Sequence, residues 1–234
     1  MRRAIEQVSP AAIEQGLARV REEISAAAAR SGRSADDVHV VAAVKYVDAE
    51  AAACFVEAGV PDIAESRLGT LVERQATGVV PDAARWHFIG RLQSREAATV
   101  AERVSMVHSL CTESAARRLA GSDARPDLLV QVNIAGDPSK DGLLPDDVER
   151  FLVELPEQLV VRGFMAMPAF AEDPQQSRGS FAALRELRDR LAPLVAGRHE
   201  LAALSIGTSQ DYSVAVEEGA THVRLGRILY AADE

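Results

Sequence analysis

Residues 38–45 carry the sequence VHVVAAVK, a run of apolar and mostly β-branched side chains that ends at a lysine. A continuous run of this kind is typical of a strand buried on both faces of a parallel sheet. Residues 38–44 are therefore predicted to form the first strand, with Lys45 at its carboxyl end.

The alternation of helix and strand begins before this run and continues after it. Residues 10–30 have the three-to-four spacing of a buried helical stripe, which ends at Ser31-Gly32 and predicts a helix ahead of the first strand. Further short apolar runs, each predicted as a strand, lie at 62–64, 86–89, 104–108, 128–134, 160–167, 203–206 and 222–225. The segments predicted as helices are 48–58, 68–76, 94–102, 113–120, 145–154, 178–195 and 210–218.

Eight strands that alternate with helices predict parallel pairing through crossover connections. Eight such units close naturally into a (β/α)₈ TIM barrel of the α/β class, here preceded by an N-terminal helix. An open, doubly wound sheet is the alternative. No linker rich in proline, glycine or serine divides the chain, so we expect residues 1–234 to form a single domain.

The composition excludes several classes of function. The formal charge is −9, from 26 Lys+Arg against 35 Asp+Glu, which disfavours nucleic acid and anionic membranes as partners because no basic cluster offsets it. The N-terminus lacks the apolar segment of a signal peptide and no transmembrane run is present, so we expect a cytoplasmic protein. Cys54 and Cys111 have no zinc-binding spacing and are expected to be reduced thiols.

Lys45 is the first candidate for chemistry. At the carboxyl mouth of a barrel, where these folds keep their reactive groups, we expect this lysine to be half-buried. Desolvation would lower its pKa and make the amine a better nucleophile toward an aldehyde, as a Schiff base requires. A lysine that extends to solvent from a strand end is the alternative.

A second candidate lies near the C-terminus. Ser205-Ile206-Gly207-Thr208-Ser209 follows the seventh predicted strand, and Arg224-Leu225-Gly226-Arg227 includes the end of the eighth. Loops at these places are the usual phosphate site of a barrel, since glycines let backbone amides approach an anion and helix N-termini favour it. Ser209 can add a hydroxyl donor and Arg227 a charge. The alternative is that both glycines only turn the chain.

Barrel closure makes strands one and eight neighbours. An amine beside a phosphate site fits a phosphorylated aldehyde such as pyridoxal 5′-phosphate (PLP). Arg224 would lie between the two and face the pyridine nitrogen, which its permanent charge would keep unprotonated. The electron sink of the cofactor would then be weak.

Other polar side chains at predicted strand ends are expected to line this pocket: Glu65-Ser66, His87, Gln93-Ser94, His108-Ser109 and Asn133. His87 lies inside its strand, so it is either a ring contact or a core histidine with satisfied hydrogen bonds. His39 and His222 are expected to be structural. No spacing predicts a Ser/His/Asp triad or a metal-binding carboxylate cluster.

The chain resembles a known family over nearly its whole length. The resemblance rests on VVAAVKYVDAE, AESRLGTLVER, WHFIGRLQSRE, HSLCTESAARRL, LLVQVNIAGDPSKDGL, VRGFMAMP and LSIGTSQDYSVAVEEGATHVRLGRILY, in family order. These motifs are similar to those of the pyridoxal phosphate homeostasis proteins, which are alanine racemase-like barrels without a second domain.

The resemblance implies that Lys45 is the Schiff-base lysine, that Arg224 faces the pyridine nitrogen, and that Ser209, Gly226 and Arg227 hold the phosphate. It also implies a protein that binds PLP and delivers it to apo-enzymes, without established catalytic turnover. Related racemases take a second acid/base from an additional domain and a partner subunit, and this chain ends nine residues after Leu225.

Several positions depart from the pattern of the family. Ser66 stands where the family commonly has asparagine, Arg95-Glu96 replace Asn-Lys, and Arg227 replaces threonine. The resemblance therefore implies a shorter polar group near the ring, the loss of a lysine associated with cofactor exchange, and an added positive charge near the phosphate.

Two other functions compete with the carrier. One is an amino-acid racemase or decarboxylase that uses Lys45 as one base and Tyr46 or His87 as the other. The other is a metal-dependent barrel or a pure interaction protein, to which Lys45 would not matter. We expect a monomer, because no exposed coiled-coil seam is present.

Overall fold

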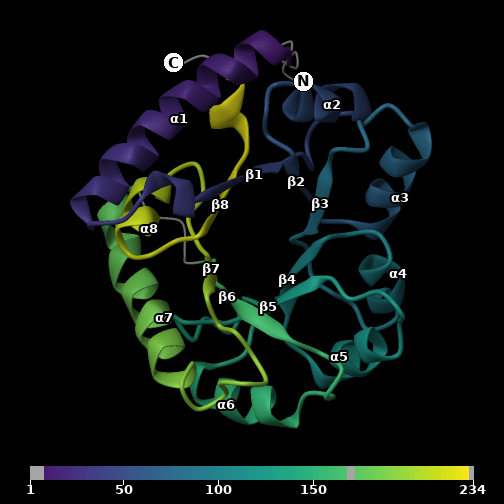
Figure 1. The fold of residues 1–234 in the computed structure, drawn as a ribbon, viewed down its shortest axis with the longest axis vertical. Coiled ribbons are helices and arrows are strands. Elements are labelled where there is room, and N and C mark those ends of the chain that lie inside the picture. The colour runs from purple at the N-terminus through teal and green to yellow at the C-terminus, as the bar shows by residue number, and fades with distance from the viewer. Residues whose placement is uncertain (1–7, 168–171, 232–234) are drawn as a thin grey trace.

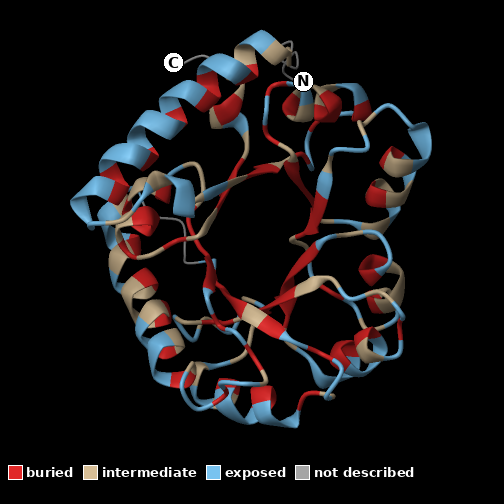
Figure 2. Ribbon diagram, viewed as in Figure 1, coloured by how far each residue is buried: buried red, intermediate tan, exposed pale blue. Residues whose placement is uncertain are grey.

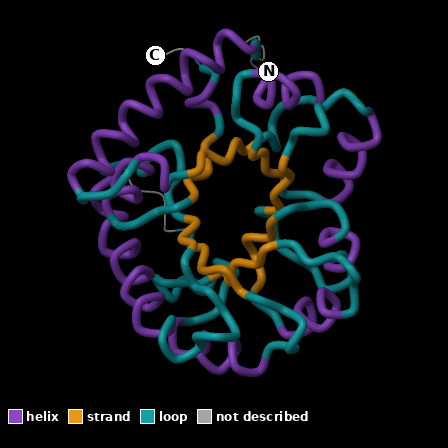
Figure 3. Tube along the Cα trace, viewed as in Figure 1, coloured by secondary structure: helices purple, strands orange, loops and turns teal. Residues whose placement is uncertain are grey.

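The computed structural model describes residues 8–167 and 172–231. Eight parallel strands close into a barrel in chain order, and β8 pairs with β1 (Figures 1 and 3). The strands are β1 (His39–Ala43), β2 (Asp62–Glu65), β3 (Arg85–Phe88), β4 (Met106–Leu110), β5 (Asp127–Gln131), β6 (Val161–Met165), β7 (Ala203–Ser205) and β8 (His222–Leu225).

A ring of helices surrounds the strands (Figure 3). The α-helices are α1 (Pro10–Arg30), α2 (Ala49–Glu57), α3 (Leu68–Thr77), α4 (Ala97–Ala101), α5 (Glu113–Ala120), α6 (Pro145–Glu154), α7 (Arg178–Leu191) and α8 (Tyr212–Glu217). Short 3₁₀ turns occur at η1 (Ala35–Asp37), η2 (Pro174–Ser177) and η3 (Arg227–Leu229).

Helix α1 takes the place in this ring that a helix after β8 would fill. It lies between α8 and α2 and packs on η3, which follows β8 (Figure 1). The Ser9 hydroxyl accepts a hydrogen bond from the backbone N–H of Ala12 and caps its first turn. A Cβ on Gly16 would lie 2.3 Å from the carbonyl oxygen of Leu229, so this close approach requires glycine. The N-terminal helix thus completes the barrel wall.

The main core lies between the strands and the inward faces of the helices (Figure 2). Apolar residues at helical spacing on α1, among them Ile13, Leu17 and Val20, are buried in it. A separate small apolar cluster joins β4, β5, β6 and β7 through Met106, Leu129, Met165 and Ala203.

The predicted barrel is confirmed, and the open doubly wound alternative is wrong. Boundaries differ where turns replace regular structure. Residues 94–96 form a turn, so α4 begins at Ala97 rather than at residue 94, and β4 begins at Met106 rather than at residue 104. Among the described residues, no helix is both long and apolar enough to cross a membrane.

Candidate functional site

Lys45 lies just beyond β1 in a tight turn at the carboxyl mouth of the barrel. The N–H of Val47 donates to the carbonyl oxygen of Val44 at 3.1 Å, which leaves Lys45 and Tyr46 at the tip. Both tip residues are exposed, and Nζ of Lys45 lies 5.0 Å from the ring centroid of Tyr46. The expectation of a half-buried lysine is therefore wrong, because Val44 and Val47 occupy the buried positions of the turn.

A buried ion pair between Arg74 and Glu65 stabilises this turn. Nη1 of Arg74 lies 3.4 Å from Oε2 of Glu65, and Nη2 of Arg74 donates to the carbonyl oxygen of Val47. Burial raises the pKa of Glu65, while the charges of Arg74 and Lys45 act in the opposite direction. Arg74 therefore ties the Lys45 turn to β2 and α3.

Arg74 is a site residue that the sequence-based expectations do not include. The available signal was its position on α3, three residues after the buried Leu71 and so on the same helical face. An arginine on a buried face needs a carboxylate partner, and Glu65 at the end of β2 provides it.

Ser66, which the sequence predicts to line the pocket, follows Glu65 at the mouth. It is half-buried, and its N–H donates to Oε1 of Glu65 at 3.1 Å. A Cβ on Gly90 would lie 1.9 Å from the carbonyl oxygen of Ser66. The ends of β2 and β3 therefore meet here, and only glycine permits the approach.

The loops after β7 and β8 meet, as the phosphate hypothesis requires. The N–H of Gly226 donates to the hydroxyl of Ser209 at 3.2 Å, and the N–H of Arg224 donates to the carbonyl oxygen of Gly207 at 3.0 Å. Arg227 is exposed, whereas the side chain of Ile206 is fully buried in the core.

The helix after β7 is shorter than expected. It starts at Tyr212 and has six residues, and the buried carboxylate of Asp211 precedes it. Oδ1 of Asp211 accepts from the N–H of Thr208 at 2.7 Å, and Oδ2 accepts from the hydroxyl of Ser177 at 2.8 Å. A negative group thus occupies the helix start, and Ser209, Gly226 and Arg227 are left as the candidate phosphate ligands.

Arg224 on β8 is buried, at 4% exposure. Its Nη1 donates to the carbonyl and hydroxyl oxygens of Ser205, both at 2.6 Å, and Nη2 donates to the carbonyl oxygen of Ala166 at 3.0 Å. Burial lowers the pKa of Arg224 to about 10, against the opposing charge of Asp211, so the guanidinium remains charged at neutral pH.

Two histidines, His87 and His108, lie in the barrel interior between Arg224 and Asp62. Nε2 of His87 lies 3.0 Å from Oδ1 of Asp62, and Nδ1 of His87 lies 2.9 Å from Nε2 of His108. Nδ1 of His108 lies 2.8 Å from the hydroxyl oxygen of Ser205. Both nitrogens of His87 therefore contact protein groups, which fits the core alternative rather than a direct ring contact.

The remaining predicted pocket residues have other roles in this structure. Asn133 organises the loop after β5, since its Nδ2 donates to the carbonyl oxygen of Asp137 at 2.7 Å and its Oδ1 accepts from the Asp137 N–H at 3.1 Å. Gln93 is exposed and Ser94 is half-buried, and Ser109 is buried with a hydroxyl that has no hydrogen-bond partner among the described residues. Arg95 and Glu96 form a surface pair, with Nε 3.9 Å from Oε1.

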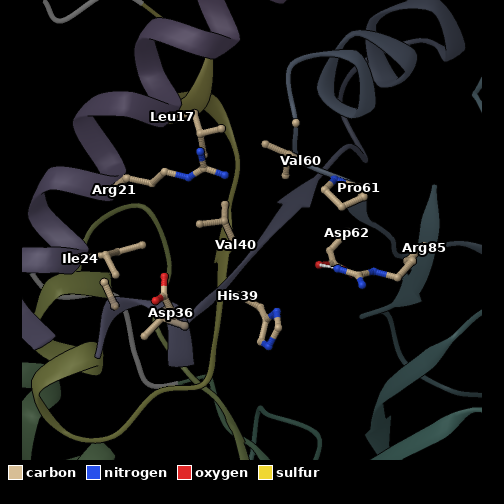
Figure 4. Close-up of a pocket in the computed structure, with 13 residues that line it drawn as sticks. Leu17, Arg21, Ile24, Asp36, His39, Val40, Val60, Pro61, Asp62 and Arg85 are labelled. Carbon is tan, nitrogen blue, oxygen red and sulfur yellow. Dashed lines mark hydrogen bonds and ion pairs between the residues drawn. The ribbon is translucent and has the colours of Figure 1, made fainter. Parts of the chain in front are cut away.

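A hollow of about 430 Å³ lies at the opposite, amino-terminal mouth of the barrel (Figure 4). His39, Asp62 and Arg85, each the first residue of its strand, line it, and Arg85 donates to both carboxylate oxygens of Asp62. His39 and His222 stack at this mouth with ring centroids 4.9 Å apart. This hollow is distinct from the mouth that holds Lys45. Within residues 8–167 and 172–231, no three His, Cys, Asp or Glu side chains converge as metal ligands.

Comparison with known proteins agrees with this arrangement. Residues 16–234 match the family model for the N-terminal domain of alanine racemase. The pyridoxal phosphate homeostasis protein of Aquifex aeolicus is 34% identical over 223 residues, which cover 92% of this chain and 95% of the relative. The protein of the same name from Pseudomonas aeruginosa is 35% identical over 229 residues, which cover 94% and 95%.

Solved structures give the same result. The structure of PipY from Synechococcus elongatus with PLP bound superposes with a TM-score of 0.79 at 28% identity and covers 94% of this chain and 100% of PipY. The chain therefore belongs to the alanine racemase N-terminal domain family and, within it, to the pyridoxal phosphate homeostasis proteins.

Proposed function

We propose that this protein binds PLP at the carboxyl mouth of the barrel, holds it covalently through Lys45, and delivers it to apo-enzymes. The observation that carries the proposal is the pairing of β1 with β8, in which Ala42 lies opposite Leu225. Lys45 and Gly226 both follow these paired ends, so an amine and a phosphate loop lie on neighbouring strands.

The side chains at this mouth match the chemical groups of PLP. Lys45 offers an exposed amine for the aldehyde, and the hydroxyl of Ser209, which accepts from the N–H of Gly226, offers a donor for the phosphate. The hydrogen bonds of the described residues account for three of the five N–H groups of Arg224, and a guanidinium can direct the others at a ring nitrogen. When bound, PLP supplies an aldehyde that reacts reversibly with amines and a ring that withdraws electrons.

Arg224 supports a carrier more than a catalyst. A guanidinium that stays charged near the ring nitrogen disfavours protonation of that nitrogen, and this limits electron withdrawal by the ring. The exposure of Lys45 favours exchange, because incoming amines can reach the covalent link from solvent. The relatives named homeostasis proteins fit the same role.

The covalent link can be tested cleanly because the sequence contains two lysines, Lys45 and Lys140. Incubation with PLP, reduction with borohydride and peptide mass mapping should place one pyridoxyl-phosphate increment on the peptide that contains Lys45. Wild-type protein that stays colourless with added PLP, or an increment confined to Lys140, would refute the proposal.

Delivery needs a separate experiment. Loaded, dialysed protein is mixed with an apo PLP-dependent enzyme in the presence of a scavenger that traps free PLP. Reactivation under these conditions supports direct transfer, whereas reactivation no faster than from an equal amount of free PLP would contradict it.

An amino-acid racemase or decarboxylase is the second candidate, and the position of Tyr46 favours it. Tyr46 lies beside Lys45 and is 76% exposed, so its hydroxyl could serve as a second acid/base. His87 is a poor alternative because both of its nitrogens contact Asp62 and His108. Deuterium incorporation at Cα across a panel of free amino acids, lost in Tyr46→Phe, would support this function over the carrier.

A further inference from the structure

A continuous chain of hydrogen bonds crosses the barrel interior from one mouth to the other. Arg224 donates to the hydroxyl of Ser205 at 2.6 Å, and that oxygen lies 2.8 Å from Nδ1 of His108. Nε2 of His108 lies 2.9 Å from Nδ1 of His87, and Nε2 of His87 lies 3.0 Å from Oδ1 of Asp62. All five side chains are buried.

The two ends of this chain fix its direction. A guanidinium has no acceptor, so Arg224 can only donate. A carboxylate has no donor, and Asp62 is ionised: burial by itself would raise its pKa, but hydrogen bonds from His87 and Arg85 hold it well below the usual range. When both histidines are neutral, every hydrogen bond between the two ends therefore points from Arg224 toward Asp62.

This direction assigns the tautomer of each histidine. His87 must donate from Nε2 to Asp62, which leaves its Nδ1 as the acceptor for His108. His108 must then donate from Nε2 and accept the Ser205 hydroxyl proton at Nδ1. Burial, followed by the charges of His87, Arg224 and His222, lowers the pKa of His108 well below its ordinary value, which favours the neutral imidazole that this pattern needs.

We propose that Ser205 and His108 are positioning residues for Arg224, and that Asp62 at the opposite mouth sets their hydrogen-bond direction. With Nη1 held by Ser205 and Nη2 held by Ala166, the plane of the guanidinium is fixed. The remaining N–H groups then have one orientation toward the site. The tautomer assignment does not depend on a bound ligand, whereas the effect on a bound ring rests on the proposed function.

One alternative pattern uses the same distances. A doubly protonated His87 would donate from both nitrogens, His108 would then donate from Nδ1 to Ser205, and the direction of that half of the chain would be reversed. The two patterns differ in which nitrogen of His108 carries the proton. That difference can be measured without any ligand.

The first experiment is ¹⁵N NMR of the five histidines in the ligand-free protein at neutral pH. The proposal expects His87 and His108 to be neutral, each with its proton on Nε2. In Asp62→Ala, which removes the acceptor for Nε2 of His87, we expect this pattern to be lost, whereas Arg85→Gln should keep it because the carboxylate remains. A proton on Nδ1 of His108, or an unchanged pattern in Asp62→Ala, would overturn the assignment.

The second experiment measures the bound cofactor in Ser205→Ala against a matched control. The control, Ser109→Ala, removes a buried serine hydroxyl on β4. Among the described residues this hydroxyl has no hydrogen-bond partner, and it lies outside the chain of hydrogen bonds. We expect Ser205→Ala to shift the absorption band of lysine-bound PLP and to weaken PLP binding by about tenfold, as the loss of one buried hydrogen bond would. Ser109→Ala should leave both unchanged.

The results test the positioning of Arg224 and the histidine tautomers separately. Equal behaviour of Ser205→Ala and Ser109→Ala would refute a positioning role, since both variants carry the same loss of a buried hydroxyl. A wild-type protein that takes up no PLP would refute the proposed function and the effect on the ring together. The histidine tautomers, read in the ligand-free protein, would still decide the direction of the chain of hydrogen bonds.

Discussion

The two mouths of the barrel differ in how their polar side chains are satisfied. At the amino-terminal mouth charged residues in the first two positions of the strands pair with one another, as Arg85 does with Asp62 and Arg162 with Asp127. At the carboxyl mouth Lys45 is exposed on a turn. Charged groups that are already paired stabilise a structure, whereas a group left accessible can bind a ligand. This difference favours the carboxyl mouth for binding even though hollows of measurable size lie at the other.

Removal of the accessible amine should have the largest effect on PLP binding at the carboxyl mouth. We expect Lys45→Ala to abolish the reducible link to PLP and to weaken retention of the cofactor by at least about a hundredfold, or about 2.7 kcal/mol. Lys140→Ala is the control, because Lys140 is half-buried and donates to the carbonyl oxygen of Met167 at 3.0 Å. Equilibrium dialysis measures both variants. Equal retention in the two would contradict the assignment.

Removing the side chain of Arg74, which supports the Lys45 turn, should have the largest effect on stability. Arg74→Met leaves the buried carboxylate of Glu65 without its partner and releases the carbonyl oxygen of Val47. Breaking a buried pair from one side costs about 3 kcal/mol. We expect chemical denaturation to show this loss, and the borohydride-trapped fraction on Lys45 to fall.

The double variant Arg74→Met, Glu65→Gln tests the mechanism of that loss. It removes the unpaired charge, so it should recover a large part of the free energy of unfolding while the Lys45 turn stays loose. If the double variant is as unstable as Arg74→Met, the cost comes from lost packing rather than from an uncompensated carboxylate.

The site could be predicted only in part, because an apolar run shows where a strand ends but not how the chain turns after it. Lys45 just after β1 and the meeting of the glycine-containing loops after β7 and β8 were predictable from apolar runs and glycine spacing. The exposure of Lys45 was not, since it depends on a turn in which Val44 and Val47 take the buried positions. The buried role of Arg74 depends on which face of α3 meets the barrel.

The fold itself was predictable to a greater extent. Parallel strands covered by helices are buried on both faces, so short apolar runs in the sequence mark where they lie. The hydrogen-bond chain through His87 and His108 was not predictable, because inward orientation on separate strands becomes known only when the barrel register is known.

Low pH should destabilise the fold through His222 at the amino-terminal mouth. Burial first, and then the charges of His39 and His87, lower the pKa of His222 to about 3, against the opposing charge of Asp62. The unfolded chain therefore takes up a proton below about pH 6.5, which the folded protein resists until about pH 3. Stability is fully present above this window and falls as the pH decreases, by about 1.4 kcal/mol per pH unit for this group.

Denaturation at pH 7.5, 6.0 and 5.0 measures that slope. His222→Gln should reduce it, because glutamine has no proton to gain. A slope that is the same in wild type and His222→Gln would show that other groups control the acid response.

The smallest expected effect comes from the surface ion pairs of the amino-terminal mouth. Nε of Arg162 lies 2.8 Å from Oδ1 of Asp127, and Nη1 contacts Glu200, but the arginine side chain is 38% exposed. Solvent screens such a pair, so Arg162→Gln should cost less than about 1 kcal/mol. PLP binding should not change, because the pair lies at the mouth opposite Lys45. A measurable loss of PLP affinity in Arg162→Gln, at unchanged stability, would mean that the two mouths are coupled through more than the Asp62 chain.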